Sequence, residues 1–273
     1  MKYFSVLMSV YYGESHEYLA QCLESLSVQT FPASEIVIVK DGKLTNELEN
    51  VLLLWKEKLP IKLEGYEENK GLAYALNYGL QFCSYALIAR MDGDDVSMPD
   101  RFEKQIEFFE QNNDVVAVGA SILEFYSKDE IKYIGKRDYP IRTDRSSISL
   151  FKGTPIAHPV AMIKADVLKE YRYRTDVISN EDIDLWFRLI SDGHFIENIN
   201  EPLLKYRITD KTFLRRNSIK AWSEFKIYYN NLVKLHGFSR LLIFPLLRFI
   251  FRLLPQKAIK KIYFSAKRYK LLI

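Results

Sequence analysis

The sequence is poor in the features that mark secreted and membrane-spanning proteins. Its 273 residues include two cysteines, Cys22 and Cys83, which are far apart and in apolar surroundings. We therefore expect buried thiols in a reducing compartment and no disulfide. No stretch reaches the roughly 18 to 20 uninterrupted apolar residues of a membrane-spanning helix. The apolar segment Tyr3–Val10 lacks the small-residue cleavage site of a signal peptide, and we predict it to be a buried strand.

Glycine-rich phosphate-binding loops are also missing. The first predicted strand is followed by Tyr11-Tyr12-Gly13-Glu14, which contains a single glycine. A nicotinamide-dependent oxidoreductase needs G-x-G-x-x-G at this place, and a sugar-nucleotide pyrophosphorylase needs a glycine-rich loop there. The sequence therefore disfavours both classes, although each would share an α/β fold.

Acidic residues are absent from the last part of the chain. Up to Glu224 there are 28 Lys/Arg and 35 Asp/Glu, whereas Phe225–Ile273 has 11 Lys/Arg and no acid, so the net charge of +4 hides an asymmetry. Such an asymmetry indicates that the tail has a different partner from the body. We predict an α/β domain over residues 1–215 and a basic, amphipathic helical tail over residues 216–273.

Short apolar runs alternate with helical patterns through the first half of the chain. This order predicts an α/β fold with a doubly wound, mostly parallel sheet, in which ligands bind at the carboxyl ends of the strands. In the second half we predict a helix over Glu181–Ser191 and helices from Asn217 onward. The further strands that we predict are Glu35–Val39, Ile61–Glu67, Tyr85–Met91, Val115–Leu123, His158–Lys164 and Leu203–Arg207.

A dense group of acids follows the predicted strand Tyr85–Met91. Asp92, Asp94 and Asp95 lie within four residues, and three carboxylates that close repel one another unless a cation neutralises them. Mn²⁺ or Mg²⁺ would suit, because both prefer oxygen ligands and bind carboxylates together with phosphates. The alternative is a turn of solvated acids, but its place after a buried strand favours a metal site.

Five sequence blocks in order carry a family resemblance. The chain resembles the family 2 glycosyltransferases, which have the GT-A fold, over roughly Phe4–Arg207. The blocks are Ser5–Tyr12, Ser25-Leu26-Ser27-Val28-Gln29-Thr30, Asn69–Gly79, Arg90–Asp95 with Pro99-Asp100-Arg101-Phe102, and Glu181-Asp182-Ile183-Asp184-Leu185-Trp186.

The resemblance implies a site for a nucleotide-sugar donor. Asp41 would accept a hydrogen bond from the uracil of a UDP-sugar, and Tyr11 and Glu14 would flank the nucleotide. Asp92 would meet the ribose or the metal, and Asp94 would bind the metal, which is Mn²⁺ or Mg²⁺. The other residues implied on the donor side are Asn69, Lys70, Arg90, Gly93 and Asp95. Taken alone, Asp41-Gly42 is also an ordinary turn and Asn69 an ordinary helix cap.

The resemblance also implies a catalytic base. Asp182 would take the proton from the acceptor hydroxyl as that oxygen attacks the anomeric carbon, which inverts the configuration. Glu181 would orient sugar hydroxyls, although acids at a helix start also serve the helix dipole. His158 would contact the acceptor or the diphosphate, or else be structural. Arg207 lies where relatives have a flexible loop over the diphosphate, as do Arg215-Arg216.

One departure from the family concerns the metal. Many relatives carry a histidine shortly after the tyrosine and arginine that match Tyr206 and Arg207, whereas this chain continues Ile208-Thr209-Asp210. The metal would then be held by carboxylates and phosphates alone, or Asp210 would replace the histidine.

The tail has the pattern of a helix that lies in a membrane interface. Arg248 and Arg252 share one helical face of an otherwise apolar segment, and we expect the basic residues to face anionic headgroups. The alternative is a basic helix packed on the domain. Nucleic acid is not an expected partner, because no motif for reading it accompanies the charge.

Together these features predict an inverting, metal-dependent hexosyltransferase. It would move a hexose from a UDP-sugar, with a lean to UDP-galactose or UDP-glucose, to an oligosaccharide acceptor on a polyprenyl-diphosphate lipid. Surface polysaccharide or O-antigen synthesis at the cytoplasmic, inner face of the cell membrane is the expected setting. The alternative is a non-catalytic subunit of the same fold that binds carbohydrate or carrier, although such a protein has little use for Asp182.

Overall fold

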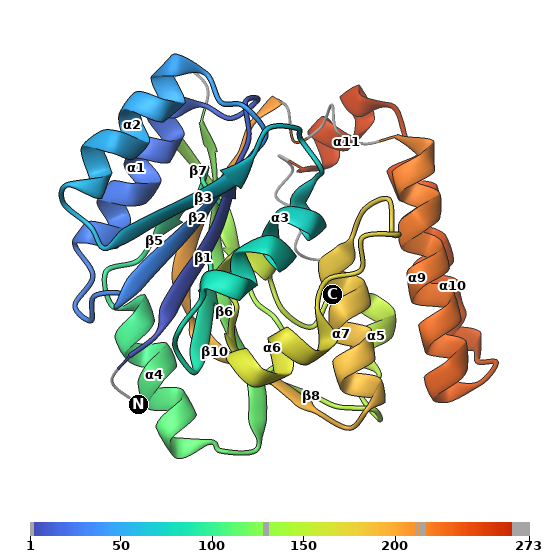
Figure 1. The fold of residues 1–273 in the computed structure, drawn as a ribbon. Coiled ribbons are helices and arrows are strands. Elements are labelled where there is room, and N and C mark those ends of the chain that lie inside the picture. The colour runs from blue at the N-terminus through green and yellow to red at the C-terminus, as the bar shows by residue number, and fades with distance from the viewer. Residues whose placement is uncertain (1–2, 128–130, 211, 213–216, 264–273) are drawn as a thin grey trace.

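One mixed sheet runs through the molecule, with helices on both of its faces (Figure 1). The structure is a computed structural model, and it describes residues 3–127, 131–210, 212 and 217–263. The strands are β1 (Ser5–Val10), β2 (Glu35–Asp41), β3 (Ile61–Tyr66), β4 (Leu87–Arg90), β5 (Val96–Ser97), β6 (Val115–Ser127), β7 (Ile131–Arg137), β8 (Arg142–Thr143), β9 (Met162–Lys164) and β10 (Phe195–Ile208).

The helices differ widely in length, from single turns to five turns. The α-helices are α1 (His16–Ser27), α2 (Asn46–Lys56), α3 (Leu72–Gly79), α4 (Arg101–Gln111), α5 (Ser149–Lys152), α6 (Ala165–Tyr171), α7 (Glu181–Ser191), α9 (Ser218–His236), α10 (Ile243–Arg252) and α11 (Gln256–Tyr263). Short 3₁₀ turns are η1 (Leu80–Phe82), η2 (His158–Val160) and η3 (Arg240–Leu242).

The strand order is β3-β2-β1-β4-β9-β6-β10-β5, with β7 paired to β6 and β8 paired to β10. Parallel pairs join β3, β2, β1 and β4, and another parallel pair joins β6 and β10. The predicted α/β fold with a mostly parallel central sheet is therefore confirmed. The second half adds antiparallel strands, of which β9 lies between β4 and β6.

The central strands form because they are apolar throughout. All six side chains of β1 are buried, which is expected for a parallel strand covered by helices on both faces. The following helices begin at capping side chains: the hydroxyl of Ser15 accepts a hydrogen bond from the Tyr18 amide, and that of Thr45 accepts one from the Leu48 amide.

Two apolar cores lie on the two faces of the sheet. Side chains of α1, α2 and α4 form one core with β1 and β2, and side chains of α3, α6, α7 and α9 form the other. Helix α3 approaches β1 closely, because a Cβ at Gly79 would lie 2.5 Å from Cδ1 of Leu7. Helix α9 contributes Tyr228 and Leu232 to the second core, so the helical extension shares its packing with the domain.

The predicted secondary structure needs correction in the second half. His158–Lys164 is not one strand: residues 158–160 form η2, where Pro159 lacks the amide that a central strand donates, and β9 follows. The strand predicted at Leu203–Arg207 is the end of the much longer β10. The helix predicted at Glu181–Ser191 is confirmed.

The absences noted in the sequence have structural counterparts. Cys22 and Cys83 are both free and buried, as expected. Within the described part of the chain, no helix combines the length and hydropathy that crossing a bilayer requires.

Candidate functional site

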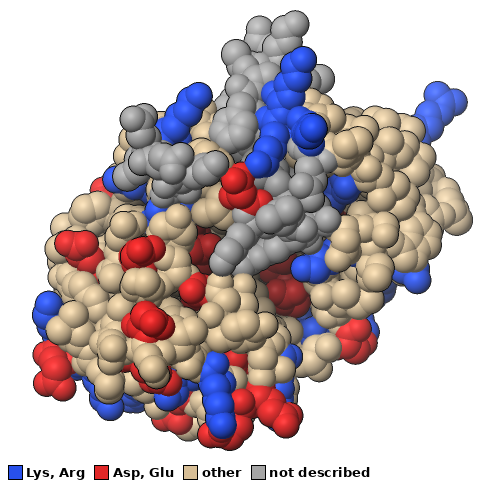
Figure 2. Space-filling model, turned by 90° about the horizontal axis from the view of Figure 1, so that it is seen from above, with Lys and Arg blue, Asp and Glu red and all other residues tan. Residues whose placement is uncertain are grey.

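The acidic turn Asp92–Asp95 lies at the carboxyl end of β4, beside the end of β1. Carboxylate oxygens of Asp92, Asp94 and Asp95 lie within 4.8 Å of one another. Figure 2 looks onto this end of the parallel strands and shows Asp and Glu side chains gathered in a hollow toward the middle of the face. The predicted grouping of these acids at a strand end is therefore present.

Arg207 holds this turn from β10. Its amide donates to Oδ1 of Asp95 at 2.7 Å, and its Nε donates to the carbonyl oxygen of Asp94 at 2.6 Å. Its guanidinium also stacks on the Tyr18 ring, 4.0 Å from the centroid. Arg207 is 3% exposed and lies within β10, as the predicted strand Leu203–Arg207 has it, so it is not part of the flexible loop that the resemblance implied. Arg215-Arg216 lie outside the described residues.

The acidic turn fits a hard divalent cation. Burial, and then the negative charges of Asp94 and Asp92, raise the pKa of Asp95 far above its usual value. Oδ2 of Asp95 is buried and has no hydrogen-bond partner. A cation at this turn would relieve both conditions, and an all-oxygen ligand set suits Mg²⁺ or Mn²⁺.

Asp210, the suggested replacement for the family's histidine, lies in different surroundings. Its Oδ1 accepts a hydrogen bond from the Tyr126 hydroxyl at 2.9 Å and forms an ion pair with Lys260. In the described part of the chain, the carboxylates close enough to share one ion are those of Asp92, Asp94 and Asp95. The structure thus favours a metal held by the acidic turn without Asp210.

Two buried arginines support the turn from below. Arg90 forms an ion pair with Asp92, and Arg101 donates from Nη2 to the carbonyl oxygen of Arg90 at 2.7 Å. Burial lowers the pKa of Arg101 to about 9. The predicted donor contact of Arg90 stays a prediction, because the observed guanidinium is buried against the turn. Sequence reasoning gave Arg101 no role, although it stands in one of the family blocks.

The loop between β1 and α1 brings Tyr11 and Glu14 to the acidic turn. The Glu14 amide donates to the carbonyl oxygen of Tyr11 at 3.1 Å. A Cβ at Gly93 would lie 2.6 Å from Oε2 of Glu14, so this carboxylate lies close against the turn. The structure therefore brings Glu14 and Gly93 together, and the contacts of Tyr11, Glu14 and Gly93 with a donor stay predictions.

Asp41 organises the loop that precedes α3. Its Oδ1 accepts hydrogen bonds from the Tyr66 hydroxyl and the Lys70 amide, at 2.9 and 2.7 Å. Its Oδ2 accepts from Nδ2 of Asn69 and the Gly71 amide, at 2.9 and 3.0 Å. These four bonds use the capacity of the carboxylate, which is 3% exposed. The predicted contact between Asp41 and uracil would have to displace one of them.

Asp182 and Glu181 begin α7 across the site from the acidic turn. Burial, followed by the negative charge of Glu181, raises the pKa of Asp182 from 3.8 to about 7. Burial also raises the pKa of Glu181, on which the charges of Arg90 and Asp92 act in opposite directions. Because the charge of Asp92 acts on Glu181, the start of α7 and the acidic turn lie near one another.

His158 lies in a buried aromatic layer beneath this site. Its Nε2 is 2.9 Å from the hydroxyl of Tyr173, and its ring packs edge-on to Trp186. Burial lowers the pKa of His158 well below its usual value, so the ring is neutral at pH 7. These surroundings favour the structural alternative for His158.

Tyr173 is a site residue that sequence reasoning missed. Charges of Asp182, Glu181 and Asp92 all act on its hydroxyl, so it lies near both acidic groups. Asn77 fixes its backbone, because Nδ2 of Asn77 donates to the Tyr173 carbonyl at 2.7 Å and Oδ1 accepts from the Tyr173 amide at 2.9 Å. Asn77 belongs to a family block, and that was the available signal.

A polar groove opens beside the start of α7. It has a volume of about 350 Å³, and Arg137, Lys220 and Arg252 line it together with Asn180 and one carboxylate, that of Glu224, which pairs with Arg252. Asn180 immediately precedes Glu181 and Asp182, so the groove adjoins the candidate base. Such a lining suits an anionic group more than an apolar one.

Comparisons with known proteins agree with this geometry. The model of glycosyl transferase family 2 matches residues 5–172. The chain is 37% identical over 265 residues to the amylovoran biosynthesis glycosyltransferase AmsE of Erwinia amylovora, covering 95% of this chain and 97% of that protein. It is 34% identical over 233 residues to an Escherichia coli UDP-Gal:alpha-D-GlcNAc-diphosphoundecaprenol beta-1,3-galactosyltransferase, covering 83% and 82%. Residues 1–349 of S. aureus TarS align with a TM-score of 0.67 at 16% identity, covering 100% of this chain and 83% of that structure.

Proposed function

The chain belongs to glycosyltransferase family 2, and from this premise we propose that it transfers a hexose from a UDP-sugar to a lipid-linked acceptor. The donor is UDP-galactose or UDP-glucose, and the setting is surface polysaccharide synthesis at the inner face of the cell membrane. The names of the two relatives support this, since one is a glycosyltransferase of amylovoran biosynthesis and the other a galactosyltransferase from UDP-Gal to alpha-D-GlcNAc-diphosphoundecaprenol.

One observation carries the proposal: Asp182, with a pKa of about 7, faces the same site as the acidic turn. A general base works best when its pKa is close to the working pH, because it is then both available and basic enough. Asp182 takes the proton of the acceptor hydroxyl. That oxygen bonds to the anomeric carbon as the bond to UDP breaks on the opposite side, so the configuration inverts.

The donor side of the site holds the nucleotide diphosphate. A divalent ion bound there would stabilise the negative charge that develops on the departing UDP. Asp94 and Asp92 are the proposed ligands, and Asp95 holds the turn through its bond from the Arg207 amide. Tyr11 and Glu14 are the proposed flanks of the nucleotide.

The acceptor side lies toward the polar groove. Arg137, Lys220 and Arg252 line it against the single carboxylate of Glu224, so basic side chains outnumber acidic ones next to Asn180 at the start of α7. A diphosphate carries the opposite charge and would bind in this groove while the terminal sugar of the acceptor reaches Asp182. A lipid-linked acceptor therefore suits the groove better than a neutral oligosaccharide.

The test couples donor binding to transfer. Calorimetry with UDP-galactose, UDP-glucose and UDP-N-acetylglucosamine, with and without Mn²⁺, should give metal-dependent binding of one donor, lost in Asp94→Asn. Transfer to a diphosphate-lipid acceptor should fall at least about a hundredfold in Asp182→Asn, while donor binding is retained. The matched control is Asp166→Asn, which removes an exposed carboxylate on α6.

The results also separate the proposal from a non-catalytic subunit. A binding subunit would hold carbohydrate or carrier without transfer by the wild type. If transfer by Asp182→Asn equalled that of the wild type, Asp182 would not be the base. A product that keeps the anomeric configuration, read by NMR, would contradict single displacement.

A further inference from the structure

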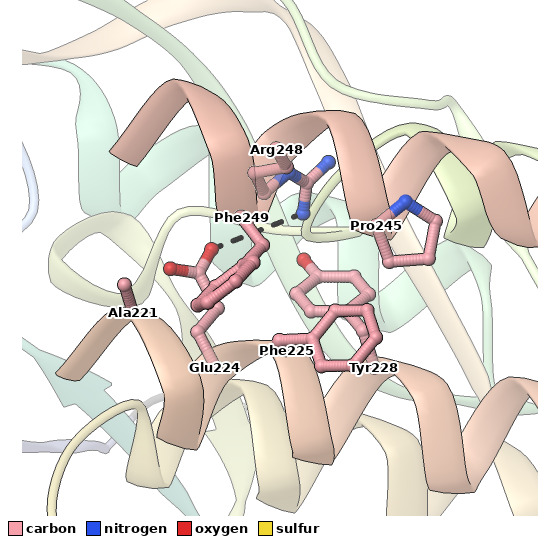
Figure 3. A pocket seen from close by; sticks show the side chains of 7 residues that line it. All are labelled: Ala221, Glu224, Phe225, Tyr228, Pro245, Arg248 and Phe249. Atoms are coloured by element: carbon pink, nitrogen blue, oxygen red, sulfur yellow. Dashed lines mark ion pairs between the residues drawn. The ribbon is translucent and has the colours of Figure 1, made fainter. Parts of the chain in front are cut away.

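Helix α10 turns its basic face inward, onto the domain. Arg252 forms an ion pair with the buried Glu224 of α9, and Arg248 lies 4.0 Å from the same carboxylate (Figure 3). The Arg248 guanidinium also lies over the Tyr228 ring, 4.5 Å from its centroid. The expectation that Arg248 and Arg252 face lipid headgroups is therefore wrong, because both side chains fasten α10 to α9.

The opposite face of α10 is apolar and exposed. In Figure 1, α9 and α10 stand side by side at one edge of the molecule, away from the sheet. The exposed aliphatic side chains follow helical spacing at the first, fourth, fifth and eighth positions and continue past the helix end. They are Ile243, Leu246, Leu247, Ile250, Leu253 and Leu254, each between 37% and 52% exposed. A continuous apolar stripe of this kind marks an interaction surface.

Aromatic side chains extend this apolar stripe onto α9 and the α9–α10 connection. Trp222 is 47% exposed and stacks on Phe225, and the ring of Phe249 packs against both. Phe238 is 84% exposed. Tryptophan at the border of an apolar surface is typical of proteins whose surface meets the lipid–water boundary.

The charged side chains of the segment that carries the stripe are all positive after Glu224. The sequence contains no acid after Glu224, and Glu224 itself is 4% exposed and paired with arginine. The exposed cationic residues of the same region are Lys226, Lys234, Arg240, Lys257 and Lys261. A stripe of aliphatic side chains on a segment whose exposed charges are basic is complementary to an anionic bilayer surface.

We propose that the exposed face of α10, from Ile243 to Leu254, inserts into the interface of an anionic membrane. The helix lies in the plane of the membrane with its leucines and isoleucines among the acyl chains and with the surrounding lysines at the headgroups. A second copy of the chain fits this face less well, because pairing two such surfaces would bring two cationic borders together.

This orientation of α10 also bears on the lipid-linked acceptor of the proposed function, on which this step of the inference rests. Arg252 ends α10 and also lines the polar groove beside Asp182, on the side of the helix that faces the domain, so α10 links the membrane surface to the groove. A lipid-linked substrate would reach the groove past the end of this helix. The docking itself depends on the exposed face and not on the transfer reaction.

Flotation with vesicles tests the proposal. The probe is phosphatidylcholine vesicles with and without phosphatidylglycerol, and the variant is Leu247→Gln combined with Ile250→Gln. We expect the wild type to float with the anionic vesicles, and the variant to lose roughly tenfold or more in partitioning. The matched control is Leu53→Gln with Leu54→Gln, which alters two leucines of α2 that are 55% and 57% exposed.

The outcomes separate the possible occupants of the face. Equal flotation of the wild type and the α10 variant would overturn the proposal, and so would an equal loss in the α2 control. A wild-type dimer that the α10 variant abolishes, without vesicle binding, would assign the face to a second copy. Transfer to a short-chain, water-soluble acceptor should be unchanged in the α10 variant, so failure of the docking and failure of the transferase proposal are distinguishable.

Discussion

Asp95, Glu181 and Asp182 are carboxylic acids in surroundings that oppose their ionisation. Burial is the first cause of the raised pKa in each case, and a neighbouring carboxylate adds to it. Acids held in this way are common where a protein binds a cation or moves a proton, and uncommon where it only folds. At the scale of the residue, the site therefore fits the proposed metal at the acidic turn and the proposed base at the start of α7.

The pH dependence of transfer should report Asp182. Because the base must be ionised, we expect kcat/KM to rise with pH through a midpoint near 7. Glu181→Gln removes the negative charge that helps to raise this pKa, so the midpoint should move to lower pH. Rates measured across the pH range for both proteins check this. An unchanged or higher midpoint in Glu181→Gln would contradict the assignment.

The same carboxyl should limit stability above neutral pH. Its folded-state pKa of about 7 exceeds the usual 3.8, so the fold favours the protonated form. That contribution is fully present at pH values below 3.8 and is lost as the pH rises through about 7. Asp182→Asn stays neutral, so its Tm should equal that of the wild type near pH 4 and exceed it by several degrees at pH 8. Calorimetric scans at both pH values decide this, and a difference that does not grow with pH would refute it.

At the scale of the element, secondary structure is predicted best from the sequence where the residues of one segment alone determine its conformation. Strands β1 and β2 are apolar throughout, and α7 begins with acids that suit a helix start. Strand β10 was seen only in part, because Glu197, Asn200 and Glu201 interrupt its apolar pattern while β6 pairs along its length. The GT-A fold that the family resemblance implied is confirmed even so.

The candidate site was predicted less completely than the fold. Local spacing indicated Asp92, Asp94 and Asp95, since neighbouring acids are visible in the sequence. Tyr173 and the hydrogen bonds of Arg207 to the acidic turn were not visible, because both depend on contacts between segments far apart in the chain. The prediction of which face of α10 points outward was wrong for a related reason. The sequence pattern separates an apolar face from a basic face, but the ion pair with the buried Glu224 of α9 decides that the basic face turns inward.

Asp41 joins the end of β2 to the loop before α3, and its loss should weaken that junction. In Asp41→Ala, buried donors including the Lys70 and Gly71 amides lose their acceptor, so we expect a loss of about 2 kcal/mol or more. Denaturant unfolding measures this, with Asp166→Ala as the control. A variant of wild-type stability whose only defect is donor binding would instead make Asp41 a nucleotide contact without a structural role.

At the scale of the whole molecule, the two sides of the site come from separate parts of the chain. The acidic turn follows β4, and the base begins α7, with β9 and β10 holding the two parts in one sheet. A ligand that bridges the site should therefore stabilise the entire fold. We expect Mn²⁺ with UDP to raise the Tm of the wild type. At a free ligand concentration of a hundred times Kd, the free energy of unfolding should increase by about 2.7 kcal/mol.

The control for this ligand effect is Asp94→Asn, whose Tm should respond to neither Mn²⁺ nor UDP. Thermal scans with Mn²⁺ alone, UDP alone and both together separate the contributions. A rise with UDP alone that equals the rise with both would mean that the metal is not part of nucleotide binding.

The order of strands in the chain differs from their order in the sheet at β9. This strand pairs with β4 on one side and β6 on the other, although it is synthesised after both. On the ribosome, β4 leaves the exit tunnel long before its neighbour is translated. Its apolar edge, Leu87–Ala89, stays open until residues 162–164 arrive. We expect nascent chains that stall in this interval to need chaperones. The chain should lose this tendency to aggregate once β9, the last strand added to the middle of the sheet, has paired with β4.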